Sequence, residues 1–113
     1  MENGPKAFEK IMGGEERTTV VIKGNDASAV GALRKAKEMR FRIPDDLYVT
    51  GFDDIELAQV VDPPLTTVHV PNRRMGTRAA RILVSLINGE KFEKIEKLEA
   101  TIQFRGTLGP APY

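Results

Sequence analysis

The sequence contains no cysteine, and its only histidine is His69. Without cysteine the chain cannot form disulfides or thiolate metal sites, which is typical of proteins that fold in a reducing compartment. Charge of one sign is not in excess either, because seventeen Lys and Arg residues stand against sixteen Asp and Glu residues. This balance provides no general electrostatic attraction to nucleic acids or anionic membranes.

Long hydrophobic runs are also missing. The longest apolar run is far shorter than the roughly 20 residues of a membrane-spanning helix, and residues 1–6 lack the apolar core of a signal peptide. We therefore expect a cytoplasmic protein with no membrane partner. With 113 residues, of which 41% are hydrophobic, the chain has the composition of one globular domain with a modest core.

What the sequence does contain is an alternation of helical and extended patterns. The strand expected at 19–22, the helix at 27–39 and the strand at 47–52 together have the size of a βαβ unit. The run 18–22 is β-branched without alternation, which predicts a strand covered on both faces. The fold class we expect is therefore α/β, a mostly parallel sheet with flanking helices. The further elements expected are a helix opening at Gly4-Pro5, a short helical piece at 55–61, an extended segment at 65–70, a helix from Pro71 to 87, and a last strand near 100–104. The apolar residues of the helix from Pro71 to 87 are predicted to face inward: Met75, Ala79, Ile82, Leu83, Leu86 and Ile87.

Polar pairs follow two of the expected strands. Asn25 and Asp26 come after the first, and Asp53 and Asp54 directly after the second. Ligands bind at the carboxyl ends of the strands in open parallel sheets. Asp53 is predicted to contact a ligand, because a carboxylate accepts from two hydroxyls at once, whereas Asp54 is interpreted as a helix cap. For Asn25 and Asp26, capping and ligand binding remain equal alternatives.

The same residues do not predict an enzyme. Adjacent carboxylates on an extended backbone point to opposite sides, so Asp53 and Asp54 do not converge on one metal ion. His69 has no nucleophile or carboxylate at a triad spacing. We therefore predict no catalytic residue, no metal site and no cofactor. Basic residues on the later helix are interpreted as a solvated surface: Arg73, Arg74, Arg78 and Arg81.

An ordered series of short motifs is similar to the carboxyl-terminal part of the effector domain of the lactose-repressor (LacI) family of bacterial transcription regulators. The series covers about residues 4–107. In chain order the motifs are Val20-Val21-Ile22-Lys23-Gly24-Asn25-Asp26, Ala29-Val30-Gly31-Ala32-Leu33, Arg42-Ile43-Pro44-Asp45-Asp46-Leu47, Gly51-Phe52-Asp53-Asp54, Pro64-Leu65-Thr66-Thr67-Val68, Met75-Gly76 with Ala79-Ala80 and Leu83, and Phe104-Arg105-Gly106-Thr107.

The resemblance implies a partial periplasmic-binding-protein-like fold of type I, a flavodoxin-like lobe, over residues 1–107. It implies that 66–94 crosses into the other lobe, and we expect 108–113 to be a loose tail. Asn25 and Asp53 resemble the family's effector-contacting pair, with Asp26 a lesser candidate. The residues that resemble the family's dimer interface are Val30, Leu33, Leu57, Val60 and Val61.

The resemblance also implies that the chain performs only part of the function of a complete regulator. No helix-turn-helix sequence is present and most of the first lobe is absent, so we expect an effector-sensing and dimerisation fragment with no direct DNA contact. Its effector would be a small polar molecule, most often a sugar in this family, and its binding would be weak because one wall of the cleft is missing. Self-association as a homodimer is expected, including a form that exchanges the helix 75–87 and the last strand. Two alternatives remain open, a fragment of a periplasmic sugar-binding protein and a small flavodoxin-like receiver or enzyme that uses Asp53.

Overall fold

The computed structural model describes residues 3–14 and 18–110. They form two compact units. Unit 1 holds the described residues up to His69 together with those from Ile102 onward, and unit 2 is Val70–Thr101. No helix among the described residues is long and apolar enough to cross a membrane.

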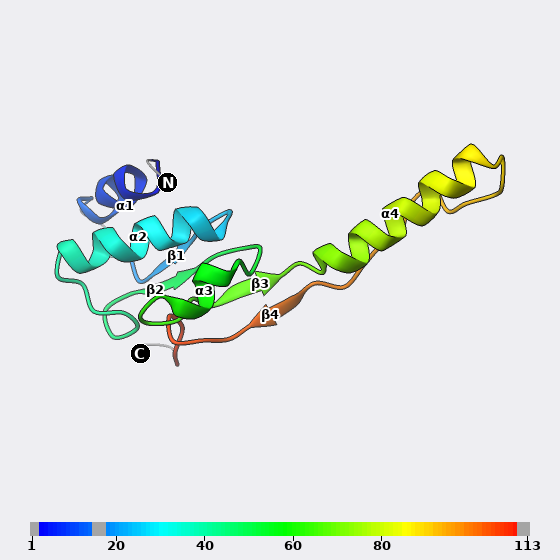
Figure 1. The fold of residues 1–113 in the computed structure, drawn as a ribbon. Helices are drawn as coiled ribbons and strands as arrows, with labels where there is room; N and C mark the ends of the chain where they lie inside the picture. Colours follow the sequence, from blue (N-terminus) through cyan, green and yellow to red (C-terminus); the bar gives the residue numbers. More distant parts are fainter. Residues whose placement is uncertain (1–2, 15–17, 111–113) are drawn as a thin grey trace. The chain divides into compact units, whose positions relative to one another are not determined.

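Unit 1 has the expected alternation of helices and strands (Figure 1). Every helix and strand predicted from the sequence is present, with ends that differ by no more than two residues. The elements are α1 (Asn3–Met12), β1 (Val20–Ile22), α2 (Asp26–Glu38), β2 (Tyr48–Thr50), α3 (Glu56–Val60), β3 (Thr67–His69) and β4 (Thr101–Gln103), and α4 (Asn72–Ile87) belongs to unit 2.

The sheet is parallel where the βαβ pattern predicted it. β1 pairs in parallel with β2, with Val21 opposite Val49. The ladder then continues from the end of β2 to β3, because the Gly51 amide donates to the Thr66 carbonyl at 3.0 Å and the Asp53 amide to the Val68 carbonyl at 2.9 Å. β4 is the hydrogen-bonded neighbour of β3. The expected α/β class is confirmed.

The core lies between the strands and α2. Small residues on α2, Ala29, Ala32 and Ala36, pack with Leu33 against the strand interior. Phe8 of α1 is buried and meets Phe41 edge to face, with ring centroids 6.3 Å apart. Leu33, which was predicted at the dimer interface, is only 3% exposed, because its side chain fills this core.

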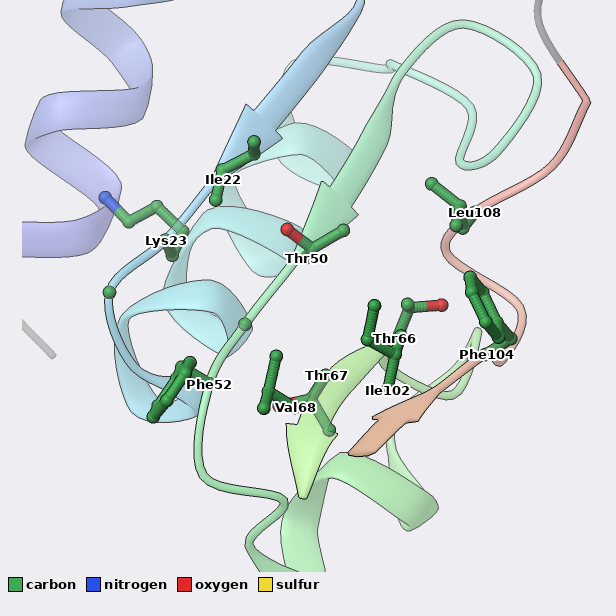
Figure 2. A pocket seen from close by; sticks show the side chains of 12 residues that line it. Ile22, Lys23, Thr50, Phe52, Thr66, Thr67, Val68, Ile102, Phe104 and Leu108 are labelled. Carbon is green, nitrogen blue, oxygen red and sulfur yellow. The ribbon is translucent and has the colours of Figure 1, made fainter. Parts of the chain in front are cut away.

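One face of the sheet in unit 1 is open. β1 alternates exposed, buried and exposed, with Ile22 78% exposed, so the expectation of a strand covered on both faces is wrong for this chain. The described helices of unit 1 cover the Val21 side only. The open face carries a shallow hollow of about 490 Å³ (Figure 2), lined by Ile22, Lys23, Gly24, Thr50, Gly51, Phe52, Thr66, Thr67, Val68, Ile102, Phe104 and Leu108.

Unit 2 consists of α4 and the irregular segment that follows it. No residue of α4 is buried, so the prediction that its apolar stripe faces inward is wrong. The rest of the described unit 2 has no helix that could cover the stripe, and an ion pair between Arg78 and Glu96 at 3.1 Å joins α4 to the segment that follows it. The apolar side chains of α4 therefore stay accessible.

Candidate functional site

The two polar pairs predicted from the sequence meet at the carboxyl edge of β1 and β2. Asn25 and Asp26 follow β1, and Asp53 and Asp54 follow β2. The Asp26 amide donates to the Phe52 carbonyl at 2.9 Å, which joins the two strand ends directly. We call residues 25–26 and 53–54 the polar edge.

Asp26 is the fixed centre of the polar edge. Its side chain is completely buried. One carboxylate oxygen accepts from the Ile55 amide at 2.9 Å and the other from the Thr67 hydroxyl at 2.5 Å. With both oxygens engaged and no accessible surface, Asp26 positions the loops around it, and its assignment as a direct effector contact does not fit this geometry.

Asn25 caps α2 with one end of its side chain. Its side-chain oxygen accepts from the Ser28 amide at 2.7 Å and so caps α2. The side chain is nevertheless exposed, and none of the hydrogen bonds described for the chain uses its amide group as a donor. The amide hydrogens therefore remain available to a ligand while the oxygen holds the helix.

Asp53 has a strained backbone conformation. Its φ is 119° and that of Asp54 is 59°, two consecutive positive values in residues other than glycine. Such conformations cost about 1–3 kcal/mol each and are found at binding sites and switches, where the surrounding structure enforces them. The Asp53 side chain is partly exposed, and its carboxylate accepts none of the hydrogen bonds described.

The sequence predicted that Asp54 caps α3, but the structure shows that it does not. The cap position is Ile55, which makes no side-chain cap hydrogen bond. Instead, Asp54 accepts from Arg105 Nη2 and from His69 Nδ1, each at 2.8 Å, and its side chain is only 8% exposed. Sequence reasoning missed both partners, because Arg105 lies 51 positions away and no local spacing links it to Asp54.

Asp54, Arg105 and His69 form a cluster that makes the free energy of unfolding depend on pH in the acid range. Burial by itself would raise the pKa of Asp54, but the hydrogen bonds from Arg105 and His69 outweigh it and hold the pKa below its usual value. A carboxyl group whose pKa is lowered by folding stabilises the protein above its unfolded pKa of about 3.9, and that contribution is lost as pH falls through the folded pKa.

We therefore expect Asp54→Asn to lower the free energy of unfolding by roughly 2 kcal/mol at pH 6, because two charge-assisted hydrogen bonds are weakened. The deficit should start to shrink as pH falls below about 4, where Asp54 of the unfolded chain becomes protonated, and should be lost as pH falls through the lower folded pKa. Urea unfolding followed by circular dichroism between pH 6 and pH 2.5 measures both. A deficit that stays constant over this range would contradict the assignment.

The hollow on the open sheet face differs from the polar edge in chemistry. Its labelled side chains are mostly apolar or threonine, and Lys23 is the one charged residue that lines it (Figure 2). Such a lining suits packing against an apolar surface better than it suits a polyhydroxylated ligand. Within the described residues, no three His, Asp or Glu side chains gather as they would around a metal ion.

The predicted dimer surface is partly accessible. Leu57 and Val60 of α3 are 40% and 75% exposed. Val30 and Val61 are partly buried and pack against the core. Because Leu33 also lies in the core, α3 is the accessible part of the predicted dimer surface.

Residues 5–108 match the periplasmic binding protein-like domain family. A curated relative, the HTH-type transcriptional repressor PurR of Vibrio atlanticus (strain LGP32), is 46% identical over 88 residues, which are 78% of this chain and 26% of the relative. The PurR repressor of Erwinia tasmaniensis is 36% identical over 114 residues, which are 99% of this chain and 33% of the relative. The chain thus spans about a quarter to a third of the length of these relatives.

Solved structures that superpose on this chain are also transcriptional regulators. A LacI-family transcriptional regulator from Bifidobacterium animalis subsp. lactis superposes with a TM-score of 0.92 at 28% identity, over 97% of this chain and 41% of that one. The transcriptional regulator CelR in complex with cellobiose has a TM-score of 0.87 at 31% identity, over 94% of this chain and 33% of that one. These relatives are regulators rather than enzymes.

Proposed function

Because this chain belongs to the periplasmic-binding-protein-like domain family, in the branch found in LacI-family transcriptional regulators, we propose that it forms one wall of an effector-binding cleft. The effector is a sugar or another small polar molecule, and binding serves regulation in the cytoplasm rather than catalysis. The observation that carries the proposal is the polar edge: an Asp53 carboxylate without a described partner lies at the same sheet edge as the exposed amide group of Asn25.

The chemistry of the pair supports this ligand class. Asp53 offers acceptors and the Asn25 amide offers donors, which together match the alternating donors and acceptors of a polyol or a purine. Asp26 contributes by fixing both loops, since it hydrogen-bonds Ile55 and Thr67 and touches no solvent. A single wall buries less than the about 70–90% of ligand surface typical of good sites, so affinity should be low for the chain alone.

Isothermal titration tests the proposal with cellobiose, D-ribose and hypoxanthine as separate probes. We expect saturable binding of at least one of them, and Asp53→Ala should weaken it more than tenfold because the charged acceptor is lost. Asp45→Ala provides the matched control, since Asp45 is an exposed carboxylate outside the polar edge. Equal binding by the wild type and Asp53→Ala would show that Asp53 is structural.

We also propose that the chain associates as a homodimer through α3, with the exposed Leu57 and Val60 at the contact. Val60→Glu should convert the dimer to a monomer in light scattering, because it places a charge in an apolar contact. Gln59→Glu adds the same charge at a neighbouring exposed position and should have little effect. A wild-type monomer over a wide concentration range would refute the proposal.

A second form of dimer exchanges α4 and β4 between chains. The accessible apolar stripe of α4 favours it, since an exposed apolar face of a helix usually marks an interface. Leu83→Glu separates the two forms: it should dissociate an exchanged dimer and leave a dimer through α3 intact.

A further inference from the structure

The segment Phe104-Arg105-Gly106-Thr107 is part of the motif series, yet the proposed function gives it no role. In the structure it is attached to the start of β3. The Thr66 amide donates to Thr107 Oγ1 at 2.9 Å, and the Arg105 amide donates to Thr66 Oγ1 at 2.9 Å. A Cβ at Gly106 would come within 2.9 Å of Pro63, so only glycine allows this close approach.

Arg105 connects this segment to the polar edge. Its Nη1 donates to the Leu65 carbonyl at 3.0 Å while its Nη2 donates to Asp54 Oδ1 at 2.8 Å. The planar guanidinium holds both acceptors at fixed angles, which a lysine ammonium cannot do. The side chain is 18% exposed, so these bonds are largely shielded from water.

His69 holds the other oxygen of the same carboxylate. Its Nδ1 lies 2.8 Å from Asp54 Oδ2. An ionised carboxylate can only accept, so Nδ1 carries the proton in this contact. Asp54 is thereby fixed from β3 and from the segment after β4 at once, and the backbone that it shares with Asp53 is the strained one, with φ values of 119° and 59°.

We propose that Arg105 and His69 are positioning residues that act through Asp54 to hold the Asp53 carboxylate in its binding orientation. The inference rests on the proposed role of Asp53 as an effector contact. Two strained residues in sequence persist only where surrounding contacts enforce them. The contacts that do so here are the two hydrogen bonds to Asp54 and the bond from the Asp53 amide to the Val68 carbonyl.

NMR of the isotopically labelled full chain tests the proposal without a ligand. A positive φ gives a strong intraresidue amide-to-Hα NOE, which the wild type should show at Asp53 and Asp54. Arg105→Met and His69→Val should each weaken this NOE and lower the amide order parameters of both residues from about 0.85 toward 0.6 or less. Arg34→Met is the matched control, because Arg34 is exposed on α2 outside the cluster.

Conservative variants separate positioning from general stability. His69→Asn keeps a donor near the position of Nδ1 and should restore the NOE and the order parameters that His69→Val loses. Arg105→Lys keeps the charge without the two-acceptor geometry and should restore them only in part. His69 is 48% exposed, so His69→Val provides a folded variant even if Arg105→Met unfolds.

The proposal is overturned if Arg105→Met or His69→Val folds and keeps the wild-type NOE and order parameters at Asp53 and Asp54. It is also overturned if His69→Asn fails to restore what His69→Val loses. Because these readouts need no bound probe, they are independent of whether cellobiose, D-ribose or hypoxanthine binds the chain. Failure of the positioning role is therefore distinguishable from failure of the proposed function.

Discussion

Replacing Asp26 by alanine is expected to lower the free energy of unfolding by roughly 3–4 kcal/mol. The change removes two hydrogen bonds to a buried carboxylate and leaves the Thr67 hydroxyl and the Ile55 amide without their acceptor. Hydrogen bonds to charged groups contribute about 1.5–3 kcal/mol each, and an orphaned buried donor adds its desolvation cost. For a domain whose total stability lies in the range of about 5–15 kcal/mol, this is a large fraction.

Urea unfolding at pH 7 measures the effect. Asp26→Asn should cost less than Asp26→Ala, because an amide oxygen still accepts from Ile55 and the amide nitrogen can donate to the Thr67 hydroxyl oxygen. Asp45→Ala, at an exposed carboxylate, should stay within about 0.5 kcal/mol of the wild type. If Asp26→Ala were as mild as Asp45→Ala, the buried network would not hold the polar edge together.

Gly51→Ala is expected to be comparably severe. A Cβ at this position would overlap Asp26 Oδ1 and would crowd Leu65 and Ala29 at 3.1 and 3.3 Å. These neighbours belong to the core or to the buried carboxylate, so none of them can move aside freely. Overpacking of this kind costs about 1–3 kcal/mol, and disturbing the Asp26 hydrogen bonds adds to it.

The control for Gly51→Ala is Gly24→Ala, because nothing lies within 4 Å of a Cβ at Gly24. We expect its urea midpoint to stay near that of the wild type, while the midpoint of Gly51→Ala falls clearly. Equal midpoints for the two variants would contradict the close approach of Gly51 to Asp26.

The fold could be predicted from the sequence because local chemistry specifies its elements. Asn25 caps α2 as its residue type suggests, and the apolar spacing along that helix matches the residues that are buried. The placement of Asn25 and Asp53 at one sheet edge followed from a general property of parallel sheets, whose carboxyl ends share that edge. Both inferences use information within a few residues or within one βαβ unit.

What could not be predicted depends on distant contacts. Asp54 looks like a cap in sequence, and only the return of Arg105 after β4 shows that it forms an ion pair. Leu33 was placed on a subunit surface by resemblance, although the strands behind α2 bury it. β1 and α4 have the apolar patterns of covered elements, and a pattern does not say whether the covering partner is present.

The central claim is that Asn25 and Asp53 bind a small polar molecule at the edge of the sheet. NMR titration of the labelled chain with cellobiose, D-ribose and hypoxanthine tests it most directly, because the Asn25 side-chain amide and the Asp53 carboxyl carbon each give their own signal. We predict that at least one probe shifts both signals in a saturable way, with smaller changes at Phe104 and Ile102 in the apolar hollow. If no probe shifts the two signals, or if the shifts are confined to the hollow, the claim is contradicted.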